Sequence, residues 1–130
     1  MDYKFKTLFT EIGGEETIDR LVQAFYPRVY ADPDLRPLFE GDMEEIMRKQ
    51  RMFLSQFTGG PALYSQEFGP PAMQQRHLPF EITPLRAKCW LRCMKEAFHE
   101  IGLDESPAGA AFYDRLTQVA GIMVNTTDYE

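Results

Sequence analysis

The sequence contains few of the residues that most often bind metal ions. Among 130 residues there are two histidines and two cysteines. The histidines, His77 and His99, are far apart in the sequence, and the cysteines do not form the Cys-x-x-Cys pair that is typical of zinc sites. A zinc site built from protein side chains is therefore not expected.

Excess positive charge is also lacking, since the formal net charge is −6 at pH 7. Nucleic-acid-binding proteins need clustered Lys and Arg to displace counterions from phosphates, so this class is excluded. No apolar run approaches the roughly 20 residues that a membrane-spanning helix requires. The first residues, Met1 to Lys6, lack the apolar stretch of a signal peptide. These absences predict a cytoplasmic protein without a nucleic-acid or membrane partner.

What the sequence does contain is a regular set of helix start signals. Three pairs place a capping side chain before a proline: Asp32-Pro33, Thr83-Pro84 and Ser106-Pro107. A fourth signal, Asp42 with Glu45, resembles a capping box. Apolar residues recur at helical spacing over residues 16–30, 33–39, 43–57, 84–101 and 107–124. No alternating strand pattern is found, so we predict an all-α fold that forms one domain over residues 1–130.

Residues 59–73 interrupt this pattern with several glycines and prolines. We predict a loop there, because these residues disfavour helix, and a loop of this length inside a compact domain is uncommon and often functional. The loop leads to His77, on a helical turn that Pro79 keeps short. This arrangement favours presentation of His77 as a ligand over its burial in a core.

Three polar side chains occupy positions where the helical pattern expects apolar ones. Gln50 lies in the middle of the apolar face of residues 43–57, Tyr26 interrupts that of residues 16–30, and Trp90 lies on the apolar arc of residues 84–101. A buried polar group without a hydrogen bond costs a few kcal/mol, so each needs a partner. Either each one bonds to a nearby backbone carbonyl, or the three converge on one bound polar atom. The pattern leaves both readings open.

The two histidines differ in their surroundings. His99 shares a helix face with Lys88, Arg92 and Lys95, which predicts a solvated side chain. A lone histidine such as His77 is more often structural than a ligand. If His77 does bind a metal, the ion must bring most of its own ligands, as haem iron does when one imidazole occupies an axial position.

The cysteines, Cys89 and Cys93, are one helical turn apart on an apolar arc. We predict reduced core thiols, because burial among apolar groups raises the pKa of a thiol and lowers its reactivity. A thiol redox function is the weaker alternative for this pair.

Several short motifs together resemble the second group of the truncated haemoglobins, over about residues 7–126. The resemblance rests on the order and spacing of these motifs rather than on any one of them. They are Phe25-Tyr26 with Arg28-Val29, Leu38-Phe39, Lys49-Gln50 with Phe53-Leu54, Gly59-Gly60-Pro61 with Tyr64, Arg76-His77, Trp90, and Met123-Val124-Asn125.

The resemblance implies a two-over-two helical sandwich, a shortened globin fold with a long loop before the proximal helix. It implies one haem b per chain, with His77 as the proximal iron ligand and Tyr26, Gln50 and Trp90 as distal hydrogen-bond donors. The residues implied to line the haem cavity are Phe39, Ile46, Phe53 and Leu54. Those implied to meet the haem propionates are Lys49, Tyr64 and Arg76.

The implied function is binding of dioxygen, carbon monoxide and nitric oxide, with high oxygen affinity from the distal donors. Detoxification of nitric oxide or peroxide would need a partner reductase, and the chain is expected to be a monomer or a weak homodimer. Pro27 directly follows Tyr26 and is expected to kink its helix. The alternative function is a helical interaction module without haem.

Overall fold

Helices make up most of residues 7–127, which are the residues that the computed structural model describes, and no strand is found among them. The elements in chain order are α1 (Leu8–Ile12), α2 (Gly14–Tyr30), the 3-10 turn η1 (Arg36–Phe39), α3 (Met43–Phe57), α4 (Leu63–Phe68), α5 (Met73–His77), α6 (Pro84–Glu100), the 3-10 turn η2 (Leu103–Glu105) and α7 (Pro107–Met123). The predicted all-α fold class is confirmed.

The long helices begin where the capping signals predict. The side chains of Asp42, Thr83 and Ser106 each accept a hydrogen bond from a backbone N–H in the first turn of α3, α6 and α7, respectively. Glu45 does not complete a capping box, because its carboxylate pairs with the guanidinium of Arg48 at 2.6 Å. Helix α2 continues past Pro27 to Tyr30, so the proline does not end the helix.

The structure differs from the predicted elements in three places. Helix α1 was not predicted, because five residues are too few for apolar periodicity; it is defined by its ends, Thr7 as a capping residue and Gly13 at φ 111°. The segment predicted as a helix over residues 33–39 forms only the η1 turn, since the Asp32 carboxylate accepts a hydrogen bond from the N–H of Asp34 and stabilises a turn there.

The third difference is the predicted loop over residues 59–73, which contains helix α4. This helix has no capping side chain and depends on tertiary contacts. The amide of Gln56, at the end of α3, donates to the Ser65 hydroxyl at 2.7 Å and accepts from the Ser65 N–H at 2.9 Å. Single-segment patterns do not reveal support of this kind, which is why the sequence indicated an uninterrupted loop.

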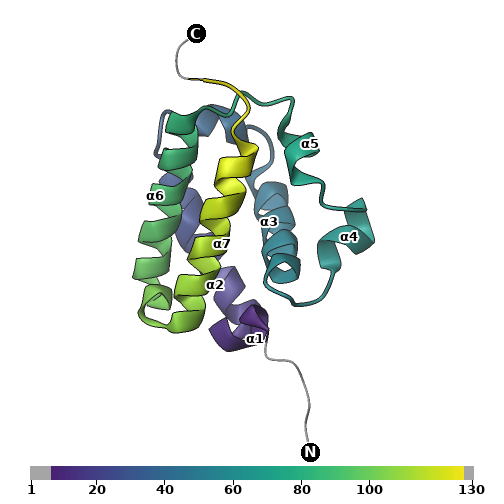
Figure 1. Cartoon of the computed structure of the whole chain (residues 1–130), viewed down its shortest axis with the longest axis vertical. Coiled ribbons are helices and arrows are strands. Elements are labelled where there is room, and N and C mark those ends of the chain that lie inside the picture. Colours follow the sequence, from purple (N-terminus) through teal and green to yellow (C-terminus); the bar gives the residue numbers. More distant parts are fainter. Residues whose placement is uncertain (1–6, 128–130) are drawn as a thin grey trace, which may run out of the picture.

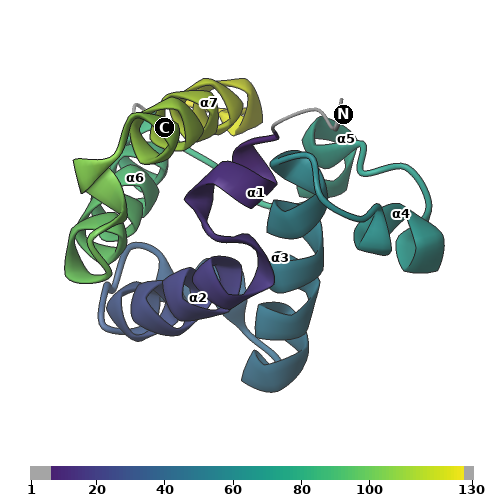
Figure 2. The ribbon, with the colours of Figure 1, turned by 90° about the horizontal axis from the view of Figure 1, so that it is seen from below.

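The long helices form two pairs, α2 with α3 and α6 with α7, and α2 also packs on α6 (Figures 1 and 2). Short helices α4 and α5 follow on the side of α3 away from α6 (Figure 2). The residues at the centre of the core have no accessible surface: Leu21, Val22, Val29, Met94, Ala97 and Phe112. Within residues 7–127, no helix combines the length and the apolarity needed to cross a bilayer.

Candidate functional site

His77 is the last residue of α5, and its side chain is half-buried. Its Nδ1 lies 2.6 Å from the backbone oxygen of Met73, one turn earlier. A carbonyl oxygen can only accept, so Nδ1 carries a proton, and in the neutral imidazole Nε2 then keeps its lone pair. No group among the described residues forms a hydrogen bond with Nε2. The imidazole is thus held in the tautomer and orientation that suit metal ligation.

Helix α5 is short and receives its support from side chains elsewhere. It has five residues, and its N-terminal flanking residue, Ala72, lies in the left-handed region at φ 41° without a capping side chain. The Arg76 guanidinium donates from Nε to the Pro71 oxygen at 2.6 Å, and from Nη2 to the oxygens of Phe68 at 2.7 Å and Pro70 at 3.0 Å. Arg76 therefore fixes the turn that delivers His77.

Tyr26 lies deep between the helices, with 1% of its surface exposed. Its ring makes edge-to-face contacts with the rings of Phe25 and Phe39, at centroid distances of 5.0 Å and 5.9 Å. Its hydroxyl forms no hydrogen bond within residues 7–127. In that range, every side-chain nitrogen or oxygen that is fully enclosed does have a partner, so the Tyr26 hydroxyl is not fully enclosed. The small exposed part of Tyr26 therefore includes its hydroxyl.

Burial, and to a smaller extent the neighbouring Tyr30, raises the pKa of the Tyr26 phenol well above its ordinary value. The phenol is consequently protonated at neutral pH and available as a hydrogen-bond donor.

Trp90 and Gln50 resemble Tyr26 in their lack of hydrogen-bond partners. The Trp90 ring packs at 5.5 Å on Phe25, so Tyr26 and Trp90 contact the same phenylalanine. Both the Trp90 indole and the Gln50 amide are half-buried, and neither forms a hydrogen bond with the described part of the chain.

Two other tyrosines show what a structural partner looks like in this fold. The Tyr30 hydroxyl donates to the Phe39 oxygen at 2.9 Å, and the Tyr113 hydroxyl donates to the Leu91 oxygen at 3.2 Å. The reading in which Tyr26, Gln50 and Trp90 bond to nearby carbonyls is therefore not realised. Their polar atoms are therefore left to solvent or to a bound molecule.

Three of the four apolar candidates, Ile46, Phe53 and Leu54, lie on α3 with Gln50, and Phe39 lies on η1. Leu54 belongs to the buried core, and Ile46 and Phe53 pack against it from α3. Phe53 stacks on Phe57 at 5.5 Å, while Phe39 meets the Tyr26 ring at a steep angle.

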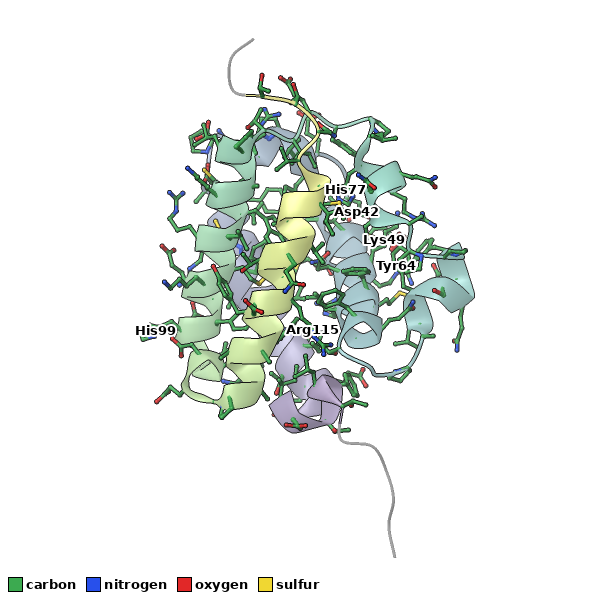
Figure 3. The ribbon with its side chains drawn as sticks, viewed as in Figure 1. Asp42, Lys49, Tyr64, His77, His99 and Arg115 are labelled. Atoms are coloured by element: carbon green, nitrogen blue, oxygen red, sulfur yellow. The ribbon has the colours of Figure 1, made fainter. Side chains whose placement is uncertain are left out.

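The polar candidates Lys49, Tyr64 and Arg76 gather around the aromatic residues of α4. Tyr64 packs at 5.0 Å on Phe68, the Lys49 ammonium lies 5.2 Å from the Phe68 ring centre, and the Arg76 guanidinium carbon lies 5.2 Å from that of Tyr64. Figure 3 shows Lys49 and Tyr64 on the same side of the molecule as His77. Two cations and an aromatic surface thus lie near one end of the segment that carries His77.

The other histidine and the thiols lie elsewhere. His99 projects outward from α6 (Figure 3), is 83% exposed at its side chain, and contacts Asp104 at 2.9 Å, as its predicted solvated position requires. Cys89 and Cys93 are buried and free, and burial raises the pKa of both thiols. The prediction of unreactive core thiols agrees with this environment.

A small cluster that the sequence did not indicate lies beside Cys89. Ligand atoms of Asp32, Asp34 and Cys89 lie within 4.8 Å of one another. The Asp32 carboxylate is already paired, because Arg92 donates to it at 2.7 Å and the Asp34 N–H at 2.8 Å. These bonds explain the cluster as a turn between α2 and η1 that is ion-paired with Arg92 of α6.

Comparison with known proteins places these features in a family. The sequence-family model described as bacterial-like globin matches residues 7–125 of the chain. The chain is 47% identical over 120 residues to Group 2 truncated hemoglobin YjbI of Bacillus subtilis, over 92% of this chain and 90% of that protein.

Solved structures give the same answer. The group II truncated haemoglobin from Bacillus anthracis has a TM-score of 0.92 at 46% identity, covering 96% of this chain and 95% of that chain. The truncated oxygen-avid haemoglobin from Bacillus subtilis has a TM-score of 0.88 at 45% identity, covering 92% and 100%. The chain therefore belongs to the bacterial-like globin family, as a truncated haemoglobin of the second group with the haem-based binding of diatomic ligands that this family implies.

Proposed function

We propose that each chain binds one haem b through Nε2 of His77. The observation that carries the proposal is the hydrogen bond of Nδ1 with the Met73 oxygen, which selects the tautomer of the neutral ring with a lone pair on Nε2. In most histidine ligands the ring nitrogen that does not bind the metal donates a hydrogen bond. This bond fixes the orientation of the ring and increases the basicity of the ligating nitrogen. When bound, the haem supplies the iron at which dioxygen, carbon monoxide or nitric oxide is ligated.

Tyr26, Gln50 and Trp90 are the proposed donors to the diatomic ligand. They come from three helices, α2, α3 and α6, and α2 packs against both of the others. No side-chain hydrogen bond of these three residues is found within the described part of the chain. Donors in a water-poor site stabilise negative charge more strongly than in water, so we expect high oxygen affinity and slow oxygen release. One similar protein is described as oxygen-avid, which agrees with this expectation.

The remaining proposed site residues match the two chemically different parts of a haem, its apolar ring system and its carboxylates. The rings and branched side chains of Phe39, Ile46, Phe53 and Leu54 would cover its apolar part. Its carboxylates would meet the cations of Lys49 and Arg76 and the Tyr64 hydroxyl around α4. These local cations offset the net negative charge of the chain, which otherwise disfavours an anionic cofactor.

The direct test is the absorption spectrum of the reduced, CO-exposed protein and of His77→Ala. We expect a CO-haem spectrum in the wild type that is lost or strongly altered in the variant, and restored in part by added imidazole. The matched control is His99→Ala, which removes an exposed histidine and should leave the spectrum unchanged. An unchanged His77→Ala spectrum would show that another residue holds the iron. Absence of a Soret band after haem is added to the wild type would favour an interaction module.

Whether the proposed site also catalyses a reaction is decided by measuring turnover. Oxidation of nitric oxide or reduction of peroxide would draw on the same three donors and on a partner reductase. A steady rate with NADH, a reductase and nitric oxide would establish such an activity, whereas stoichiometric reaction alone would limit the protein to ligand binding.

A further inference from the structure

Asn125, which lies just beyond the end of α7, forms hydrogen bonds with the segment that follows His77. Its side-chain Nδ2 donates to the oxygen of Phe80 at 2.8 Å and to that of His77 at 3.2 Å. Its Oδ1 accepts from the Ile82 N–H at 3.0 Å, and its backbone N–H donates to the Ile82 oxygen at 3.0 Å. One residue thus joins the end of α7 to three residues of the turn between α5 and α6.

An asparagine is required by this set of partners. The two carbonyl oxygens need a donor and the Ile82 N–H needs an acceptor, which fixes the orientation of the amide. An aspartate would place a carboxylate oxygen against both carbonyls, and an alanine would remove all three side-chain bonds. The longer side chain of glutamine would displace the amide from its partners.

The residues directly after His77, 78–81, are exposed and gain little support from burial. Helix α5 ends at His77, and the side chains of Leu78 and Phe80 are exposed, at 62% and 45%. Pro79 has no N–H to donate. Within the segment itself, the Phe80 N–H donates to the His77 oxygen at 2.9 Å. Ordering of this turn therefore depends on bonds from outside it. The Arg86 guanidinium donates to the Glu81 oxygen, and Asn125 is the residue that reaches the carbonyls of His77 and Phe80.

We propose that Asn125 is a positioning residue for His77. It fixes the carbonyl of His77 while the Met73 oxygen fixes the imidazole, so both ends of the residue are held. Through this residue the end of α7 sets the direction in which Nε2 points. The inference rests on the proposed function, namely that Nε2 of His77 binds the haem iron.

The test compares Asn125→Asp with the wild type as the haem-loaded protein. The matched control is Gln118→Glu, which makes the same amide-to-acid change at an exposed position of α7 without a side-chain hydrogen bond to the described residues. Two quantities are measured: the iron–histidine stretching band of the ferrous form by resonance Raman, and the rate of haem transfer to excess apomyoglobin. For Asn125→Asp we expect a shifted or broadened band and transfer faster by about tenfold, because two donated hydrogen bonds are lost. The control should match the wild type.

A second variant is needed in case the new carboxylate of Asn125→Asp perturbs folding. Asn125→Ala should give the same direction of change in both quantities, with far-UV circular dichroism as in the wild type. A wild-type band and transfer rate in Asn125→Asp and Asn125→Ala would overturn the inference and leave the proposed ligation by His77 intact. A wild-type protein without an iron–histidine band would overturn both.

Discussion

The two sides of the proposed haem site are built in opposite ways. Tyr26 and Trp90 come from helices of 17 residues, α2 and α6, and their rings are held by aromatic packing on Phe25. His77 comes from a helix of five residues whose support is a set of hydrogen bonds from Arg76 and Asn125 to backbone carbonyls.

The two sides therefore differ in the interactions that hold their side chains in position. A packed ring keeps its place when a polar atom is removed from it, because apolar contacts provide most of the stabilisation. The five-residue helix α5 lacks this stabilisation by apolar packing, and an isolated helix of this length is not stable in water. Distal substitutions should therefore change ligand binding with little effect on folding, whereas substitutions around α5 should change the retention of haem.

The largest expected effect is on the distal side. Tyr26→Phe removes a hydroxyl that has no partner among the described residues while keeping the packed ring. We expect oxygen dissociation faster by about tenfold to a hundredfold, the range for losing one hydrogen bond to a charged acceptor. The free energy of unfolding of the haem-free protein should be unchanged or slightly increased. Stopped-flow oxygen release and denaturant unfolding measure the two quantities.

Tyr30→Phe is the matched control, one turn further along α2. Its hydroxyl donates to the Phe39 oxygen, so its removal should lower stability by about 1 kcal/mol with a smaller effect on oxygen release. The opposite result, with Tyr26→Phe destabilising and Tyr30→Phe releasing oxygen faster, would reverse the assignment of the two tyrosines.

A smaller effect is expected on the proximal side. Arg76→Lys keeps the positive charge but cannot reproduce bonds to three carbonyl oxygens with the spread of a guanidinium. We expect haem loss faster by roughly fivefold to tenfold, as one or two hydrogen bonds are lost. Transfer of haem to apomyoglobin measures the rate. A loss rate equal to that of the wild type would show that charge alone matters at this position.

The smallest effect concerns the start of α5. Ala72 lies at φ 41° and ψ 49°, a left-handed conformation that costs a residue with a Cβ about 1 kcal/mol. Ala72→Gly should relieve this cost, partly offset by the greater entropy of glycine in the unfolded chain. We expect a change in unfolding free energy between zero and an increase of about 1 kcal/mol in thermal or denaturant unfolding. A clear decrease would show that the methyl group of Ala72 contributes to the structure.

The sequence predicted the parts of the fold that depend on local signals. Helix α3 spans the predicted residues 43–57, and α6 and α7 begin at the predicted prolines, because capping and apolar spacing act within one segment. It also indicated Tyr26, Gln50 and Trp90 as misplaced polar groups, since each breaks the pattern of its own helix.

Two of the features that the sequence did not predict depend on contacts between segments. Helix α4 needs Gln56 from α3, and the turn after His77 needs Asn125 from beyond α7. In the sequence, Asn125 is one polar residue among several near the end of the chain. No spacing rule connects it with His77, because the connection arises only when α7 folds back beside α5.

The support of α5 by hydrogen bonds has a consequence for stability within the molecule. Native-state hydrogen exchange divides proteins into cooperative units that open at different free energies. Residues of α2, α6 and α7 surround the most deeply buried side chains, whereas α4 and α5 contribute few buried residues. We therefore expect the segment with His77 to open at a lower free energy than the core formed by α2, α6 and α7. Its opening would expose the site for haem exchange while the remaining helices stay folded.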